Sequence, residues 1–264
     1  MIPLKDYNPT RHFPYVTVVL IALNVIVFLF VQRPTESDDG DQAEFAYRYA
    51  AIPCEVVEGR PLSEPEIVRT LDPRISDETA CDRTAPLDRR DGFFSGKQVW
   101  LALLYSMFLH GGFLHLGGNM LFLWIFGNNI EDHMGAVPYV LFYLLSGLAA
   151  AAAHIAVQPE STVPVVGASG AVAGVMGAYL VLYPNVPIRT FFWFLFLIFF
   201  RDIAAKWLLG FWFLLQFFTS PDAGVAWVAH VGGFVFGALV ALLFRERLRR
   251  PTVPAADLPP QYPY

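Results

Sequence analysis

Charged residues are scarce in this 264-residue sequence, and they are unevenly placed. Asp, Glu, Lys and Arg make up 16% of the chain, whereas hydrophobic residues make up 55% and aromatic residues 16%. Most charges lie between Arg33 and Lys97 or near the two ends, so long apolar blocks carry almost none. With a mean hydropathy of +0.46, this pattern excludes an ordinary soluble domain and indicates a polytopic membrane protein. The net charge of -5 averages two sides of a bilayer, and we expect no nucleic-acid partner.

Cysteine is nearly absent, since Cys54 and Cys81 are the two that the sequence contains. Neither belongs to a Cys-x-x-Cys pair or a Cys/His cluster, so the sequence predicts no metal site and no cofactor. A disulfide between them is possible if their segment lies outside the cytoplasm. The sequence leaves this open, because it does not give the Cα separation that a bridge requires. We also expect no cleavable signal, because the first apolar run is long and lacks a small-residue cleavage site.

The apolar blocks predict an all-α protein with six transmembrane helices. The fourth is short, with about 15 apolar residues against the roughly 20 needed for a full crossing. In chain order, the expected spans are about Pro14 to Val31, the His110–Asn119 region to near Phe126, about Ala136 to Val157, a short helix from Ser169, Ile203 to Phe218, and Val225 to Phe244.

Several segments between these spans are predicted not to cross the membrane. Arg33 to Lys97 is too long for an ordinary loop, and we expect it to be partly folded into short amphipathic pieces. Gln98 to Leu109 is too short to span, which favours a helix lying in the membrane interface. Arg189 to Phe200 is rich in aromatic residues and is interpreted as an interfacial or re-entrant piece. Asn128 to His133 and Ser220 to Gly224 are predicted turns.

Basic residues set the expected orientation in the membrane. With six spans, the N-terminus, the Arg189–Lys206 segment and the Arg245–Arg250 cluster share one side, which is then the cytoplasm. The turns after the third and fifth spans contain no Lys or Arg. The expected organisation is a cytoplasmic N-terminus (1–13), a first span (14–31), a large extracytoplasmic first loop (32–97), a core with five spans (98–247) and a disordered cytoplasmic tail (248–264).

Four polar residues are predicted to lie at one depth in the membrane. Spans two, four and six would run in the same direction, with His115 and Asn119 in the first turns of span two. Ser169 begins span four, and His230 lies about five residues into span six. At 1.5 Å of rise per residue, all four fall within about 10 Å of their helix starts.

The chemistry of these side chains suggests a serine hydrolase. A serine hydroxyl is a poor nucleophile until a base takes its proton, and the neutral imidazole of His230 suits that role toward Ser169. The backbone at Ser169 and Gly170, the His115 ring and the Asn119 amide are candidate donors to an oxyanion. No acidic residue is placed to orient His230, so the sequence predicts a dyad rather than a triad.

Each of these residues also has a purely structural explanation when it is taken alone. A Gly-x-Ser-Gly sequence in an apolar helix is more often a packing motif, and an intramembrane histidine is about as often structural as functional. His115 and Asn119 are spaced i, i+4 and could simply cap their helix. A metal site formed by His110, His115 and His230 is disfavoured, because no carboxylate or thiolate joins them. Their joint occurrence at one depth favours catalysis.

In combination, these motifs resemble those of the rhomboid family of intramembrane serine proteases. The resemblance covers about Gln98 to Phe244. It implies a six-helix bundle with a water-filled cavity open to the outside, a Ser169–His230 dyad, and an oxyanion supported by His115 and Asn119. The motifs are His110-x4-His115-x3-Asn119, Glu131-x3-Gly135, Gly167-Ala-Ser169-Gly170 and Ala229-His230-x2-Gly233.

The resemblance further implies an intramembrane serine endopeptidase that cleaves transmembrane segments of membrane-protein substrates. We expect it in a bacterial inner membrane with both termini cytoplasmic, and the sequence leaves the oligomeric state open. The chain departs from the family pattern at Leu101, where an Arg often follows the Trp, and at Ala173, where some members have Tyr. The alternative is a catalytically silent relative that binds transmembrane clients, but retention of Ser169 and His230 favours the enzyme. A transporter is disfavoured by the lack of an inverted repeat.

Overall fold

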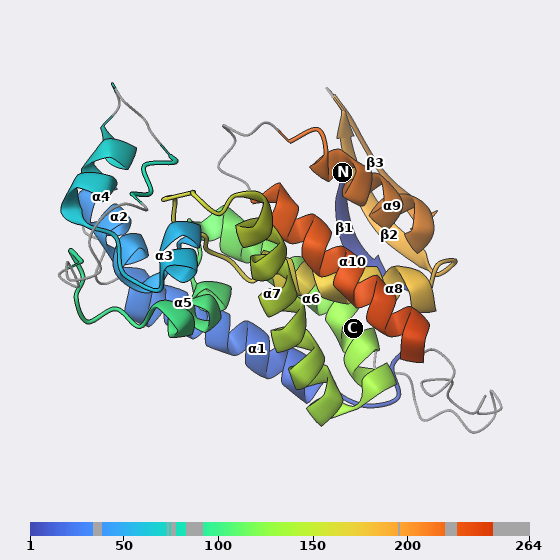
Figure 1. The fold of residues 1–264 in the computed structure, drawn as a ribbon. Helices are drawn as coiled ribbons and strands as arrows, with labels where there is room; N and C mark the ends of the chain where they lie inside the picture. The colour runs from blue at the N-terminus through green and yellow to red at the C-terminus, as the bar shows by residue number, and fades with distance from the viewer. Residues whose placement is uncertain are drawn as a thin grey trace.

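The chain folds into a bundle of helices with a cluster of short helices at one end and a small sheet at the other (Figure 1). The structure is a computed structural model, and it describes residues 1–33, 39–72, 74, 78–82, 92–194, 196–219 and 226–244. The predicted turn at 220–224 and the predicted tail at 248–264 lie outside these residues. The elements are β1 (Ile2–Asp6), α1 (Tyr15–Ile26) with a π-helical continuation (Val27–Gln32), α2 (Asp39–Tyr49), α3 (Pro53–Glu58), α4 (Glu64–Leu71), α5 (Val99–Tyr105) with a 3₁₀ turn (Ser106–Phe108), α6 (Phe113–Met134), α7 (Ala136–Val157), α8 (Ser169–Leu182), β2 (Pro187–Phe194), β3 (Leu197–Ala204), α9 (Ala205–Gln216) and α10 (Trp227–Phe244).

The helix lengths support a polytopic membrane protein. Within the described residues, three helices are long and apolar enough to cross a membrane: α1 with its continuation, α7 and α10. The bent pair of α5 and α6, which meet at 79°, would make a fourth. Helix α8 is apolar but has 14 residues, and α9 has 12. At 1.5 Å per residue, α8 is about 21 Å long, less than the roughly 30 Å of a bilayer core. By length and composition alone, three or four of the described helices qualify as spans, so the predicted count of six is not confirmed.

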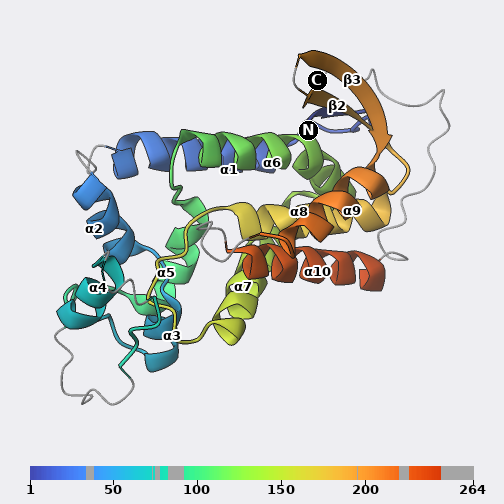
Figure 2. The same cartoon turned by 90° about the horizontal axis from the view of Figure 1, so that it is seen from above.

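Helix α8 lies at the centre of the bundle, between α6 and α10 (Figure 2). Every residue from Gly170 to Tyr179 is buried, so the helix is enclosed by protein on all sides. Small residues bring its backbone unusually close to α10. A Cβ atom added at Gly237 would lie 1.9 Å from the carbonyl oxygen of Gly174, and one added at Gly177 would lie 2.0 Å from that of Phe234. Only glycine permits this separation.

Helix α6 is longer than the sequence indicated. The predicted turn at 128–133 is wrong, because the helix continues through these residues. Their polar side chains are used inside the fold rather than in a solvated loop. The carboxylate of Glu131 accepts hydrogen bonds from the backbone N–H groups of Val16 (2.8 Å) and Thr17 (2.7 Å), at the N-terminus of α1. A negative charge there also interacts favourably with the dipole of α1.

The expectation of an all-α fold is also wrong in one region. Strands β1, β2 and β3 form an antiparallel sheet in that order, with Ile2 opposite Phe191. The segment at 189–200, predicted to be an interfacial or re-entrant piece, therefore belongs to a β-hairpin. Its run of aromatic and β-branched residues has high strand propensity. Asp6 anchors the sheet to the bundle, since its carboxylate accepts hydrogen bonds from Asn129 and Tyr179, both at 2.7 Å.

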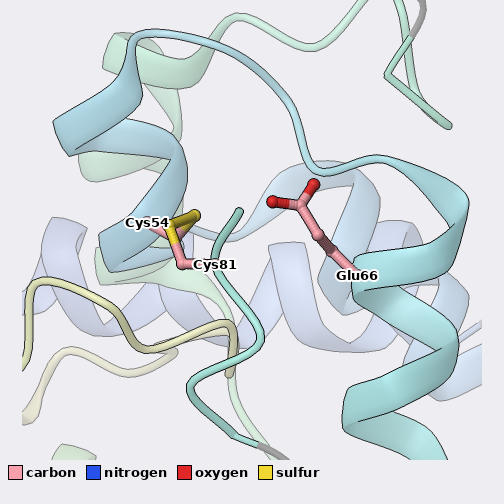
Figure 3. Close-up of side chains that lie close together, drawn as sticks. All are labelled: Cys54, Glu66 and Cys81. Atoms are coloured by element: carbon pink, nitrogen blue, oxygen red, sulfur yellow. A yellow bond between two sulfur atoms is a disulfide. The ribbon is translucent and has the colours of Figure 1, made fainter. Parts of the chain in front are cut away.

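The charged segment after α1 is folded over much of its length. Helices α2, α3 and α4 pack at the end of the bundle opposite the sheet (Figure 2). A disulfide joins Cys54 to Cys81, which settles the question that the sequence left open. Glu66 lies beside the disulfide (Figure 3). These three groups are not a metal site, because the sulfurs are bonded to each other. The Glu66 carboxylate is also occupied by Arg60 and Ser63.

This folded segment is connected to the residues that lead into α8. Ala51 and Val165 form a β-bridge, in which the Val165 N–H donates to the Ala51 carbonyl at 2.8 Å. Ser106 joins the two sides, because its hydroxyl accepts from the Ala51 N–H at 2.6 Å and its carbonyl accepts from the Gly167 N–H at 2.8 Å. The chain immediately before Ser169 is therefore fixed by the first-loop segment and by the end of α5.

Candidate active site

Ser169 and His230, the residues predicted as nucleophile and base, lie in hydrogen-bond contact. Ser169 is the first residue of α8, and its Oγ is 2.8 Å from Nε2 of His230 on α10. The chain reaches Ser169 through Gly167, whose φ of 127° is a conformation that favours glycine. This turn places the hydroxyl at the N-terminal end of α8, where backbone N–H groups have no intrahelical partner.

The close approach of α8 and α10 at this level depends on glycine in both helices. A Cβ atom at Gly233 would lie 2.1 Å from the carbonyl oxygen of Gly170, so the two backbones are in direct contact. Gly233 is three residues after His230, and Gly170 follows Ser169. The glycines therefore set the separation at which an imidazole and a serine hydroxyl can share a hydrogen bond.

The second ring nitrogen of His230 has a partner that the sequence analysis missed. Nδ1 of His230 lies 2.8 Å from Oε1 of Gln216, at the end of α9. The ring of Trp212, one turn earlier on α9, lies 5.9 Å from the His230 ring between centroids. The sequence signal was present, since Gln216 is the one side-chain amide in the apolar run of α9. Its uncharged amide takes the place where the sequence predicts no acidic partner for His230.

His115 lies on the other side of the serine, at the start of α6. A Cβ atom at Gly167 would be 2.9 Å from Nε2 of His115 and 3.5 Å from Oγ of Ser169, so the ring and the hydroxyl flank this glycine. Nδ1 of His115 accepts a hydrogen bond from the Gly111 N–H at 3.2 Å. In a neutral imidazole the proton is then on Nε2, which faces the site as a donor.

Asn119 and Gly170 complete the set of predicted donors. Asn119 is one turn after His115 on α6 and is 7% exposed. Its amide nitrogen has no hydrogen-bond partner among the described residues. A buried amide donor without a protein partner is unusual and suits a group that interacts with a ligand or water. Gly170 is buried in the first turn of α8.

His110, the first residue of the His110-x4-His115 motif, packs against the site. Its ring lies 5.2 Å from that of His115 in an edge-to-face arrangement. Its backbone is held by Gln32, whose amide donates to the His110 carbonyl at 2.6 Å and accepts from its N–H at 3.0 Å. Among the described residues, His110, His115 and His230 do not bring three ligand atoms together in the manner of a metal site.

One cavity contains all the predicted site residues. Its volume is about 690 Å³, and it extends from α6, α8 and α10 to the first-loop segment at Ala51 and Pro53. This volume is within the range of cavities that bind small molecules or short peptide segments. A serine in contact with an imidazole, with several hydrogen-bond donors opposite, can carry out acyl transfer. The site residues that line the cavity are His115, Asn119, Ser169, Gly170 and His230.

Comparison with known proteins gives a consistent family. Residues 97–247 match the family model described as "Rhomboid domain". The chain is 29% identical over 149 residues to "Rhomboid protein 1, mitochondrial" of Saccharomyces cerevisiae, covering 53% of this chain and 40% of that protein. It is 31% identical over 148 residues to "Rhomboid protease GluP" of Bacillus subtilis, covering 54% of this chain and 25% of that protein.

A third relative is matched over a longer stretch. The chain is 29% identical over 182 residues to "RHOMBOID-like protein 6, mitochondrial" of Arabidopsis thaliana, covering 67% of this chain and 54% of that protein. The matched part thus spans between 25% and 54% of the length of these three relatives.

Proposed function

Since this chain belongs to the rhomboid family, we propose that it is an intramembrane serine endopeptidase that cleaves transmembrane segments of other membrane proteins. The chain is an integral membrane protein with apolar helices long enough to cross a bilayer. The observation that carries the proposal is the contact of 2.8 Å between Ser169 Oγ and His230 Nε2. A serine that served only to pack two helices would not need an imidazole nitrogen as its hydrogen-bond acceptor.

In the proposed reaction, His230 Nε2 takes the proton of Ser169 as Oγ attacks the carbonyl carbon of the scissile bond. The negative charge that develops on the carbonyl oxygen is stabilised by preorganised donors. These are the Nε2–H of His115, the amide of Asn119 and the first backbone N–H groups of α8. His230 then gives its proton to the leaving amine. Water that enters the cavity then attacks the acyl-enzyme while His230 takes its proton. His230 returns this proton to Ser169 Oγ as the acyl group leaves.

The substrate is proposed to be a transmembrane segment that enters the cavity in an extended form. A helical peptide has its carbonyl groups engaged in internal hydrogen bonds, so the cleaved stretch must unwind to present one to Ser169. The cavity extends from α6, α8 and α10 to the first-loop segment at Ala51 and Pro53. In the proposed topology this is the level where a span leaves the bilayer core. Water and a peptide backbone can meet at this level.

We further propose the six-span topology and orientation predicted from the sequence, with the short helices α8 and α9 counted as spans. Strand β1 pairs with β2, so the N-terminus and the segment after α8 share one end of the bundle. The first-loop helices lie at the other end (Figure 2). A disulfide is typical of an oxidising compartment, which favours an extracytoplasmic first loop and cytoplasmic termini. A bacterial inner membrane accommodates this arrangement.

The test is cleavage of a transmembrane reporter by the full chain in detergent. The wild type should cut the reporter, and Ser169→Ala should reduce cleavage to background. Ser146→Ala is the matched control, because Ser146 is a buried serine on α7 outside the cavity and its removal should leave cleavage intact. Equal cleavage by the wild type and Ser169→Ala would refute the assignment. Binding of the reporter by both proteins without cleavage would support the alternative, a silent relative that binds transmembrane clients.

A further inference from the structure

We propose that Gln216 on α9 is a positioning residue that holds His230 in the tautomer able to accept the Ser169 proton. This inference rests on the proposed function and deepens it. It replaces the sequence-based picture of an unsupported dyad with a chain of three side chains from three helices: Gln216 on α9, His230 on α10 and Ser169 on α8.

The orientation of the Gln216 amide follows from its surroundings. Its Nε2 group lies 3.1 Å from the carbonyl oxygen of Trp212, one turn earlier on the same helix. A carbonyl only accepts hydrogen bonds, so the amide group that faces it is the NH₂. The Gln216 oxygen therefore faces His230, and its distance from Nδ1 is 2.8 Å.

This oxygen fixes the position of the His230 proton. An amide oxygen has no proton to donate, so Nδ1 of the imidazole must carry the N–H in that hydrogen bond. In the neutral ring, Nε2 is then unprotonated, and its lone pair points to Ser169 Oγ at 2.8 Å. The opposite tautomer would place two acceptors against each other at Gln216 and a proton on the nitrogen that must act as the base.

The same contact favours the protonated state that forms during the reaction. When His230 accepts the serine proton, the ring becomes an imidazolium whose Nδ1–H still donates to Gln216. Gln216 is 8% exposed, so little water is available at this nitrogen to replace the contact. An amide carries no charge, and it therefore orients the ring without the electrostatic contribution that a triad carboxylate would add.

The contacts that His230 makes with Gln216 and with the Trp212 ring both come from α9. Trp212 and Gln216 are four residues apart and lie on one side of that helix. Elsewhere on its surface α9 exposes large apolar residues, including Phe211 and Leu214. The productive tautomer of His230 thus depends on α9 being in place when the proton is transferred.

The first experiment reads the tautomer directly and does not require activity. The full chain, labelled with ¹⁵N-histidine in detergent, is compared with Gln216→Leu, and His230→Ala assigns the His230 signals. We expect His230 to be protonated at Nδ1 in the wild type and to become a mixture of tautomers in Gln216→Leu. A wild-type ring protonated at Nε2, or an unchanged spectrum in Gln216→Leu, would overturn the proposal.

The second experiment measures turnover of the transmembrane reporter. Gln216→Leu keeps the size of the side chain but removes the acceptor, and we expect kcat to fall about 10- to 100-fold with KM unchanged. Gln216→Glu retains an oxygen that can accept a hydrogen bond from the Nδ1–H of His230. We therefore expect its kcat to stay within about threefold of the wild type. Leu214→Ala, at an exposed position of the same helix, is the control that should cleave normally.

The outcomes separate this inference from the proposed function. If the wild type and Ser169→Ala cleave equally, the protease assignment fails, and the histidine spectra still decide the role of Gln216. If the wild type cleaves but Gln216→Leu keeps full kcat, or Gln216→Glu is as impaired as Gln216→Leu, the positioning role fails while the protease stands. Thermal unfolding of each variant distinguishes a lost contact from a misfolded helix.

Discussion

The distance between α8 and α10 should affect the rate of cleavage even when it is changed away from the dyad. The substitution Gly237→Ala tests this. The added Cβ would lie 1.9 Å from the carbonyl oxygen of Gly174. A carbon and a carbonyl oxygen in ordinary contact are about 3.3 Å apart. The two helices must therefore separate locally by about 1.4 Å, because the atom that blocks the methyl group belongs to the backbone and cannot rotate away.

This displacement should reach the dyad. Gly237 is seven residues after His230, about two turns along the same rigid helix. A shift of about half of 1.4 Å would extend the Ser169–His230 contact from 2.8 Å to about 3.5 Å, beyond hydrogen-bonding distance. Misplacing a catalytic group by about 1 Å costs about 100-fold in rate. We expect a loss of that size in kcat, with a stability cost of about 1–3 kcal/mol for overpacking.

The assay is cleavage of the transmembrane reporter, with thermal unfolding as a check on folding. Gly210→Ala is the matched control, because Gly210 lies in the middle of α9 and an added Cβ there would meet nothing within 4 Å. It should cleave at the wild-type rate and be slightly more stable. Full activity of a folded Gly237→Ala protein would show that the separation of α8 and α10 does not set the geometry of the dyad.

Three further predictions concern contacts that stabilise α1 and the first-loop segment. Glu131→Gln should lower stability by about 1–2 kcal/mol in thermal unfolding, because the charge that caps the N-terminus of α1 is lost; an unchanged midpoint would show that the cap is dispensable. Cys81→Ser should destabilise the first-loop segment by about 3.5 kcal/mol, from the closure of a loop with a separation of 27 residues. Limited proteolysis should then cut that segment faster than in the wild type, and equal rates would contradict the estimate. Burial raises the pKa of Glu66, but hydrogen bonds from Arg60, the Asp82 N–H and Ser63 together hold it down at about 2. This carboxylate therefore stabilises the fold fully above its ordinary pKa of 4.5 and loses that contribution as pH falls toward 2. The acid unfolding curve of Glu66→Gln should be flatter over that window, and a curve as steep as the wild type would contradict this.

The sequence predicted the parts of the fold that depend on apolar length. Helix α7 has the bounds that the sequence predicted, and α8 begins at Ser169 as expected. Both are continuous apolar runs that start and end at polar or glycine-rich segments, which is the strongest signal for a membrane helix. The close contact of Ser169 with His230 likewise agrees with the expectation that they lie at one depth, although their catalytic roles are a proposal.

Features whose partner lies far along the chain could not be predicted from the sequence. The hairpin of β2 and β3 pairs with β1, nearly 190 residues away, and a short apolar run alone does not distinguish a strand from a helix. The polar residues at 128–133 suggested a turn, but Glu131 is used to cap α1. The contact of Gln216 with His230 could not be predicted, because an amide in an apolar helix has no motif of its own. Its role becomes visible only when α9 and α10 are placed side by side.

The proposed reaction requires Ser169 to be a nucleophile that is activated by His230. The most direct measurement is the mass of the full chain after reaction with a serine-directed fluorophosphonate, with the modified residue located by peptide mapping. One adduct is expected, on Ser169, and it should be lost when His230 is changed to Ala although the variant remains folded. Absence of the adduct from Ser169 in the wild type, or equal labelling of the His230→Ala variant, would contradict it.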